Sequence, residues 1–261
     1  MQPSVSEIPE SLISLLRSAN HIAVLTGAGI SAESGIPTFR DQLTGLWTNF
    51  RPEELATPAA FRQNPSLVWQ WYAHLRQAMR QAQPNPAHYA LAAMEHLVPT
   101  FTLLTQNIDS LHQRAGSTNV VELHGNIARM KCAEDLQLIE TWQENTQEPP
   151  PCPRCGNFIR PDIVWFGERL LDDVLAVADR AVKTCDIFFS IGTSAEVEPA
   201  ASFAPRALGR GATVVVINLD VRTSEARWLY KFNARAGEFL PLLIQTVWPQ
   251  ARQPQGYPSQ P

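Results

Sequence analysis

The sequence predicts an α/β fold, in which a Rossmann-like doubly wound parallel sheet carries two inserted modules, one small and rich in cysteine and one helical. Short apolar runs alternate with helical stretches along most of the chain, as they do when helices connect parallel strands. Glycine or polar residues follow directly after several of these runs, where the ligand-binding loops of such a sheet begin. Three cysteines lie within 24 residues in a segment that interrupts the alternation.

The expected elements follow in chain order. Apolar residues at helical spacing predict a first helix over residues 8–18, and the apolar run at residues 21–25 predicts a buried strand that ends at Thr26 and Gly27. Four further apolar runs predict strands at residues 101–105, 120–121, 187–191 and 213–217. Helical stretches separate several of these strands at residues 86–97, 172–183 and 199–209.

Two segments do not follow the alternation. Residues 46–83 are rich in apolar and aromatic residues and look helical, whereas residues 126–163 hold the cysteines and a Glu-Pro-Pro-Pro stretch. We therefore expect one domain over residues 1–251, with a sheet core formed by residues 8–45, 84–125 and 164–250. Residues 252–261 are rich in Pro and Gln and are expected to form a disordered tail.

Composition and charge exclude several classes of protein. Hydrophobic residues make up 44% of the chain and charged residues 18%, which predicts a packed core. The net charge of −4 argues against bulk binding to nucleic acid or to anionic membranes, so neither is expected as a partner. No apolar run has the length of a membrane span, and no signal peptide is visible. Clustered cysteines are typical of a metal site in a reducing compartment, which predicts a cytoplasmic protein.

A glycine-rich loop follows the first predicted strand. Residues 27–32, Gly-Ala-Gly-Ile-Ser-Ala, fit the pattern G-x-G-x-x-G/A, whose glycines let the backbone approach a pyrophosphate at the start of a helix. The alternative is a tight strand-to-helix turn without a ligand. A dehydrogenase would place an acidic residue at a strand end about 20 residues later. Glu53 and Glu54 lie instead in a polar stretch next to a proline, which disfavours hydride transfer.

Polar residues also follow the next two predicted strands. Gln106, Asn107 and Asp109 come after the strand at 101–105, so they are expected to point into the ligand crevice. The alternative is that Asn107 or Asp109 caps a helix. His124 follows the next strand within the block Leu-His-Gly-Asn, although a lone histidine is more often a structural hydrogen-bonding residue than a catalyst.

The cysteines predict a structural zinc site. Cys132 and the pair Cys152 and Cys155 have a spacing close to that of a zinc ribbon with four cysteines, so residues 126–163 are predicted to be a zinc-ribbon module. Asp135 stands where the fourth cysteine is expected, and a carboxylate oxygen can bind zinc. Glu134 could serve in its place, or the module could hold by packing without a metal.

Residues 27–40, Gly-Ala-Gly-Ile-Ser-Ala-Glu-Ser-Gly-Ile-Pro-Thr-Phe-Arg, resemble without a break the cofactor-binding loop of the sirtuin family. The blocks Gln-Asn-Ile-Asp and His-Gly-Asn resemble the catalytic segments of that family in order and context. The resemblance extends over nearly the whole chain, through residues 163–168, 192–194, 216–218 and 236–238. Ala-Glu-Ser-Gly and Pro-Thr-Phe-Arg are similar to the prokaryotic branch that includes broad-acyl deacylases.

The resemblance implies an NAD-dependent protein-lysine deacylase that acts on acyl-lysine proteins or peptides and releases nicotinamide, O-acyl-ADP-ribose and free lysine. His124 would be the base, while Asn107 and Asp109 would position the ribose and carboxamide of NAD. Val164 and Phe166 would receive the acyl-lysine peptide. The implied NAD-binding residues are Gly27, Ala28, Gly29, Ser31, Ala32, Ile36, Phe39, Arg40, Gln106, Gly192, Thr193, Ser194, Asn218 and Ala236; of these, Phe39 would shield the reactive centre from water.

The same branch recognises an acidic acyl group with a Tyr and an Arg three residues later. Tyr72 matches the tyrosine, but Leu75 stands at the position of the arginine. Arg76, one residue further on, could substitute because residues three and four apart share a helix face. The alternative for Arg76 is a solvent-exposed charge. We therefore expect deacetylation to be the main activity and desuccinylation or demalonylation to be weaker.

Three other functions are compatible with parts of the sequence. The Gln-Asn-Ile-Asp and His-Gly-Asn blocks disfavour a nicotinamide-dependent dehydrogenase. The negative net charge and the intact catalytic blocks disfavour a zinc-ribbon binding module without catalysis. Mono-ADP-ribosyl transfer would use the same cleavage of NAD, so the acceptor found by product analysis distinguishes it.

Overall fold

The computed structural model describes residues 8–38, 52–143, 147–221 and 225–251. The predicted tail at 252–261 and the predicted NAD-binding residues Phe39 and Arg40 lie outside this range. In the described part, no helix is long and apolar enough to cross a membrane.

A six-stranded parallel sheet forms the larger lobe, with the strand order β3-β2-β1-β7-β8-β9. Its strands are β1 (His21–Thr26), β2 (Thr100–Thr105), β3 (Val120–Glu122), β7 (Ile187–Ile191), β8 (Thr213–Asn218) and β9 (Leu229–Asn233). Along the chain, β2 and β3 extend the sheet on one side of β1, and β7, β8 and β9 then extend it on the other side. The predicted doubly wound sheet is confirmed.

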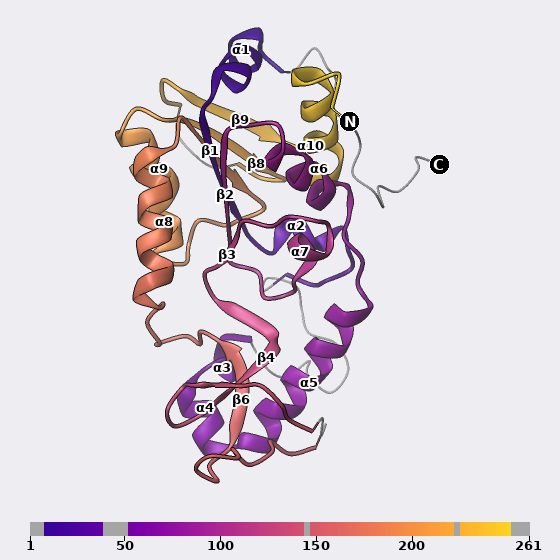
Figure 1. The fold of residues 1–261 in the computed structure, drawn as a ribbon, viewed down its shortest axis with the longest axis vertical. Coiled ribbons are helices and arrows are strands. Elements are labelled where there is room, and N and C mark those ends of the chain that lie inside the picture. The colour runs from indigo at the N-terminus through magenta and orange to yellow at the C-terminus, as the bar shows by residue number, and fades with distance from the viewer. Residues whose placement is uncertain (1–7, 39–51, 144–146, 222–224, 252–261) are drawn as a thin grey trace.

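Helices cover both faces of this sheet (Figure 1). One face packs against α1 (Glu10–Ser18), α6 (Pro86–Glu95) and α10 (Ala236–Val247), and the other against α8 (Asp172–Thr184) and α9 (Phe203–Gly209). Alternation along β1 separates the two cores, because Ile22 and Val24 enter the first and Ala23 and Leu25 the second. Since every central strand is buried on both sides, its sequence is a continuous apolar run.

Two C-terminal elements were not among those predicted. The edge strand β9 is half-exposed along most of its length, so neither a continuous apolar run nor a clean alternation marks it. Residues 236–238, which the resemblance includes, form the first turn of the second such element, α10. Shorter helices follow two of the strand ends, namely α2 (Gly29–Ala32) and α7 (Leu111–Arg114).

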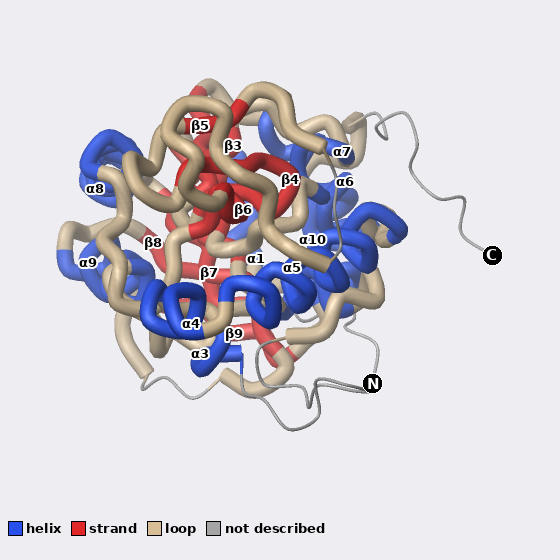
Figure 2. Tube along the Cα trace, turned by 90° about the horizontal axis from the view of Figure 1, so that it is seen from below, coloured by secondary structure: helices blue, strands red, loops and turns tan. Residues whose placement is uncertain are grey.

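The two inserted segments pack together into a smaller lobe. The described part of the helical segment forms α3 (Pro52–Leu55), α4 (Pro58–Gln63) and α5 (Pro65–Gln81), and the cysteine-rich segment forms an antiparallel sheet of β4 (Gly125–Cys132), β5 (Leu138–Ile139) and β6 (Ile159–Ile163). Trp69 of α5 lies in one apolar cluster with Cys132 and Cys152. Figure 2 shows α4 and α5 alongside this sheet.

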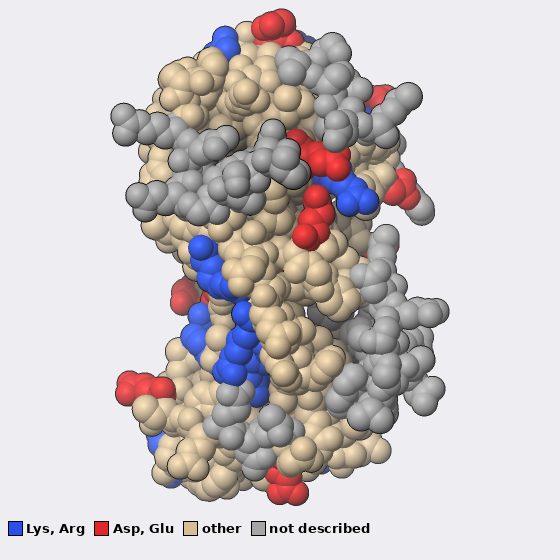
Figure 3. All heavy atoms as spheres, turned by 90° about the vertical axis from the view of Figure 1, so that its right-hand side faces the viewer, with Lys and Arg blue, Asp and Glu red and all other residues tan. Residues whose placement is uncertain are grey.

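The charged residues are not evenly spread over the surface. On the face seen in Figure 3, lysine and arginine side chains form a stripe that runs from the waist of the molecule into its lower half, whereas acidic side chains are scattered above, beside and below this stripe. A local basic patch therefore coexists with the net charge of −4.

Two buried histidines lie behind the end of β1. The rings of His88 in α6 and His112 in α7 are 4.8 Å apart between centroids, and Nε2 of His112 lies 3.0 Å from the hydroxyl of Thr26. His88 Nδ1 accepts a hydrogen bond from the backbone N–H of Asn85 at 3.2 Å, which completes a capping box at the start of α6. Burial lowers the pKa of His88 to about 3 and that of His112 well below its ordinary value. Both side chains are therefore neutral near pH 7.

From His88 and His112 we predict that the stability of the protein falls in mild acid. Because the unfolded chain binds protons on these histidines below pH 6.5 and the folded chain does not, the free energy of unfolding is undiminished above pH 6.5 and is lost progressively as the pH falls toward about 3. His88→Gln keeps an acceptor for the capping box, so the variant should lose about 2–3 kcal/mol less than the wild type between about pH 6 and pH 4. Urea unfolding at both pH values measures this difference. The control is His74→Gln, at an exposed histidine of α5, and an equal pH dependence in His88→Gln and wild type would contradict the assignment.

Candidate active site

The topological switch point of the sheet lies between β1 and β7. In sheets of this type, ligands bind outside the carboxyl ends of the strands at the switch point, and the loops that follow β1 and β7 begin there. Gly29 N–H donates to the carbonyl of Gly192 at 2.8 Å. Gly192 has a φ of +59°, and a Cβ at this position would lie 2.5 Å from the backbone nitrogen of Ile30. The sequence pattern assigns these glycines to the approach of a pyrophosphate. The structure adds a second role, because only glycine at positions 29 and 192 lets the loops after β1 and β7 touch.

A buried polar cluster joins the loops after β1 and β2. The side-chain amide of Asn107 donates to the carbonyl of Gly27 at 3.1 Å and to the hydroxyl of Ser31 at 3.0 Å. The Ser31 hydroxyl donates in turn to Asp109 at 2.7 Å. Burial raises the pKa of Asp109, and its bonds from the Leu111 amide and from Ser31 partly offset this effect. The structure therefore brings together three residues that the sequence singled out separately.

A second set of polar contacts connects the ends of β2, β7 and β8. Gln106 donates from its side-chain amide to the hydroxyl of Thr193 at 2.9 Å, and Asn218 donates to the backbone carbonyl of Thr193 at 2.9 Å. Ser194 lies next to them and is exposed. Ala236 is the buried first residue of α10, and the second residue of this helix, Gly237, donates its N–H to the carboxylate of Glu33 at 2.9 Å.

The remaining residues of the glycine loop lie in two environments. Ala28 lies immediately before α2 and is half-buried, whereas Ala32 is the last residue of that helix and is exposed. Ile36 is buried in the apolar cluster of the smaller lobe, together with Trp71 and Tyr72. The loop therefore begins at the sheet and ends against the smaller lobe.

His124 lies between the two lobes, immediately before β4. Its Nδ1 is 3.0 Å from the backbone carbonyl of Gln106. A carbonyl oxygen only accepts, so Nδ1 carries the hydrogen and Nε2 is left with its lone pair. Burial lowers the pKa of His124, and the Gln106 carbonyl partly opposes this shift. The imidazole is thus neutral and oriented to accept a proton at pH 7.

The segment predicted to receive the acyl-lysine peptide runs directly beside His124. Val164 N–H donates to the carbonyl of His124 at 3.0 Å, and Phe166 N–H donates to the carbonyl of Ala56 at 2.9 Å. This segment follows directly after β6, which ends at Ile163. Phe166 is 41% exposed.

The predicted acyl-recognition residues divide between two clusters. Tyr72 and Leu75 belong to one apolar cluster with Trp165, and the rings of Tyr72 and Trp165 stack with centroids 6.2 Å apart. The exposed position considered for Arg76 is wrong. Its guanidinium is buried and lies 5.2 Å from the Trp69 ring and 5.1 Å from the Trp142 ring, against the cysteine-rich sheet. Arg76 is buried rather than exposed because the two aromatic rings attract its guanidinium and cover the side chain.

The three cysteines converge as predicted. The sulfur atoms of Cys132, Cys152 and Cys155 all lie within 4.8 Å of one another, and those of Cys132 and Cys155 are 3.6 Å apart. Tetrahedral zinc with bonds of about 2.3 Å requires sulfur atoms roughly 3.8 Å apart. Thiolates are also the ligands that zinc prefers. The residues present thus fit a structural zinc ion.

Asp135 is placed beside this cluster but is engaged elsewhere. Its carboxylate accepts from the backbone N–H of Gln137 at 2.9 Å and from the guanidinium of Arg154 at 2.9 and 3.2 Å. The Gln137 amide and then Arg154 lower the pKa of Asp135, so the carboxylate is ionised as a ligand must be. Glu134 contacts Cys132 through its backbone N–H. Asp135 as the fourth ligand stays a prediction.

Glu122 is a residue of the site region that the sequence analysis did not single out. It ends β3 and accepts hydrogen bonds from Gln113, Asn126 and Arg129. The rule that selected Asn107, a polar residue at the carboxyl end of a parallel strand, would have selected Glu122 as well.

Comparison with known proteins places this site in context. The profile of the Sir2 family matches residues 27–199. The "NAD-dependent protein deacylase" of Methylococcus capsulatus is 44% identical over 249 residues, which is 92% of this chain and 98% of that protein. A crystal structure of a Sir2 homolog bound to NAD is 41% identical, with a TM-score of 0.85, over 93% of this chain and 95% of its own. A mutant Sir2 homologue in complex with 2′-O-acetyl-ADP-ribose is similar at 41% identity and a TM-score of 0.84, over 93% of this chain and 98% of its own.

Proposed function

Because the chain belongs to the Sir2 family and is an NAD-dependent protein deacylase, we propose that its preferred reaction is the removal of acetyl groups from protein lysine. The observation that carries the reaction is the convergence of two sets of residues at one crevice. The Ser31, Asn107 and Asp109 cluster lies at the switch point of the sheet, and His124 is bonded to the segment that contains Val164. NAD and an acyl-lysine can therefore meet at one place.

NAD supplies the driving chemistry, because its cationic nicotinamide leaves C1′ of the ribose as the amide oxygen of the acyl-lysine attacks that carbon. We assign to Asn107 and Asp109 the positioning of the ribose and the carboxamide. The fixed amide of Asn107 and the carboxylate of Asp109, held by Ser31, support this assignment. Preorganised groups of this kind lower the barrier because they need no rearrangement during the reaction.

We assign to Nε2 of His124 the role of general base. It takes the proton from a ribose hydroxyl, whose oxygen then adds to the acyl carbon. The bond from that carbon to the lysine nitrogen breaks, the lysine leaves as the amine, and one water molecule adds to the remaining cyclic cation to give O-acyl-ADP-ribose. The bond of Nδ1 to the Gln106 carbonyl fixes the tautomer that this step requires. The lowered pKa of His124 keeps the base unprotonated near pH 7. The products are nicotinamide, O-acyl-ADP-ribose and lysine.

The preference for acetyl groups follows from the apolar surroundings of Tyr72. Leu75 packs in the same cluster, and Arg76 points its guanidinium toward Trp69 and Trp142. Arg160 lies over the Trp165 ring that stacks on Tyr72, but it is already paired with Glu168 at 2.6 Å. Among the described residues, a succinyl carboxylate near Tyr72 would therefore have to compete with Glu168 for a cationic partner, and a buried carboxylate without its own partner is costly. Small uncharged acyl groups meet no such penalty.

This preference can be tested with acetyl-lysine and succinyl-lysine peptides of one sequence. We expect wild-type kcat/KM to be higher for the acetyl peptide. Leu75→Arg should raise kcat/KM for the succinyl peptide about tenfold or more, because a hydrogen bond to a charged group contributes about 1.5–3 kcal/mol. Leu75→Met is the matched apolar control and should leave the ratio unchanged. Faster desuccinylation than deacetylation by the wild type would refute the proposal.

A further inference from the structure

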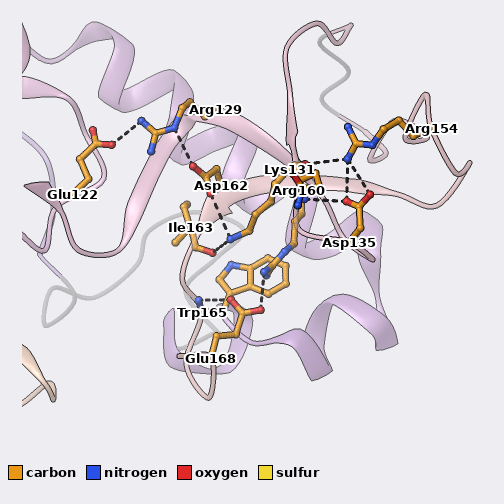
Figure 4. A network of polar contacts seen from close by, with 11 residues as sticks. Glu122, Arg129, Lys131, Asp135, Arg154, Arg160, Asp162, Ile163, Trp165 and Glu168 are labelled. Carbon is orange, nitrogen blue, oxygen red and sulfur yellow. Dashed lines mark hydrogen bonds and ion pairs between the residues drawn. The ribbon is translucent and has the colours of Figure 1, made fainter. Parts of the chain in front are cut away.

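One arginine bridges the two lobes beside the active site (Figure 4). Arg129 lies on β4, and its Nη1 is 2.7 Å from the carboxylate of Glu122 at the end of β3. Its Nε is 2.9 Å from the carboxylate of Asp162 on β6. A single planar guanidinium thus binds one carboxylate from the large sheet and one from the small sheet.

The irregular pairing of β4 with β6 puts Arg129 at this position. Asn126 pairs with Asp162, but the next pair is Met130 with Pro161, so three residues of β4 have no partner on β6. Proline has no N–H to donate to a sheet, which suits a break in the pairing. Arg129 is the last residue of this bulge, and bulges commonly redirect a side chain next to an active site.

The two carboxylates occupy equivalent positions relative to the reacting groups. Glu122 comes two residues before His124, and Asp162 comes two residues before Val164. His124 and Val164 are themselves joined, because Val164 N–H donates to the His124 carbonyl at 3.0 Å. Any change in the separation of Glu122 and Asp162 would therefore act on the distance between the base and the segment proposed to hold the acyl-lysine.

We propose that Arg129 is a positioning residue, which holds the acyl-lysine segment against the His124 loop by binding Glu122 and Asp162 together. The inference rests on the proposed function of His124 and Val164. Both carboxylates are largely buried, with side-chain exposures of 12% for Glu122 and 16% for Asp162. Two carboxylates in such surroundings repel each other strongly unless a cation lies between them.

The neighbouring charges do not duplicate this role. Lys131 lies 3.5 Å from Asp162 and donates to the carbonyl of Ile163, so its contacts stay within the small sheet. Asn126 and Gln113 donate to Glu122, but neither carries a charge. In the described part of the chain, Arg129 is the cation that contacts both carboxylates.

The test compares peptide and NAD binding in Arg129→Ala, Arg129→Lys and wild type. Arg129→Ala should raise Kd for a fluorescent acetyl-lysine peptide about tenfold, measured by anisotropy, because residues within one salt-bridge network couple by roughly this amount. Kd for ADP-ribose, which measures the cofactor side of the crevice, should change less than about twofold. Arg129→Lys should recover part of the loss, since a lysine reaches one carboxylate but lacks the fork that holds two. The KM for the acyl peptide should follow the same order while the KM for NAD does not.

Arg206→Ala is the matched control, because Arg206 of α9 is paired with Asp179 of α8 at 2.7 Å and has an exposure similar to that of Arg129. It should leave both Kd values unchanged. Equal peptide binding by Arg129→Ala and wild type would overturn the inference, as would an equal loss of peptide and ADP-ribose binding, which indicates general unfolding. If the wild type itself binds no acetyl-lysine peptide, the proposed function fails instead.

Discussion

Replacing His124 by alanine is expected to lower kcat for deacylation by about a hundredfold to ten-thousandfold, the range that general base catalysis contributes. The structure gives the reason, since the imidazole is held in one tautomer by the Gln106 carbonyl, with Nε2 available to accept a proton. Binding of NAD should change little, because the Ser31, Asn107 and Asp109 cluster forms without contact to His124. Single-turnover kinetics and equilibrium NAD binding measure the two quantities.

The pH dependence adds a second check on His124. Because its pKa is lowered by burial, the base is neutral above its ordinary pKa of about 6.5 and is protonated only at lower pH. Wild-type kcat/KM should therefore fall on the acid side at a pH below about 6.5. His74→Ala, at an exposed histidine of α5, is the control. Deacylation by His124→Ala at nearly the wild-type rate would remove the basis of the proposed mechanism.

Loss of zinc is expected to have the largest effect on stability. The free energy of zinc binding to zinc-finger peptides is about 10–16 kcal/mol. The metal can therefore contribute more to the stability of a lobe of this size than all other interactions combined. Wild-type protein should contain about one zinc per chain. Cys152→Ser should contain little or none, and the smaller lobe should become sensitive to protease because Cys152 and Cys132 share a cluster with Trp69.

The same measurement examines the fourth ligand. Asp135→Cys should tighten zinc binding against a competing chelator, and Asp135→Ala should weaken it if the carboxylate is a ligand. Arg154 binds that carboxylate in the structure, so zinc would have to displace a guanidinium. Cys185→Ala is the control, because this cysteine is buried in the large-lobe core, away from the other three. Freshly purified wild-type protein without zinc would contradict the zinc assignment.

The large lobe could be predicted well because short stretches of the sequence, namely apolar runs and the polar residues that follow them, mark its strands and site residues. The central strands are buried on both faces and read as apolar runs, and the residues that follow them, such as Asn107 and His124, are polar at the ends of these runs. The edge strand β9 lacks that signal because it is half-exposed. Local spacing also explains why Cys132 could be matched to Cys152 and Cys155.

Features that depend on contacts between distant segments could not be predicted. Helical spacing placed Arg76 on the same face as Tyr72, but the Trp142 ring that covers its guanidinium comes from a segment 66 residues away in the sequence. The packing of α5 onto the cysteine-rich sheet is likewise decided by tertiary contacts. Glu122, Arg129 and Asp162 come from three strands, and no spacing in the sequence relates them.

The most direct test of the central claim is mass spectrometry of all products formed from NAD and an acetyl-lysine peptide. We predict equal amounts of nicotinamide, O-acetyl-ADP-ribose and peptide with free lysine, and no nicotinamide release when the lysine carries no acyl group. Release of nicotinamide without acyl-lysine, accompanied by ADP-ribose attached to a protein, would contradict the account and identify the chain as an ADP-ribosyltransferase.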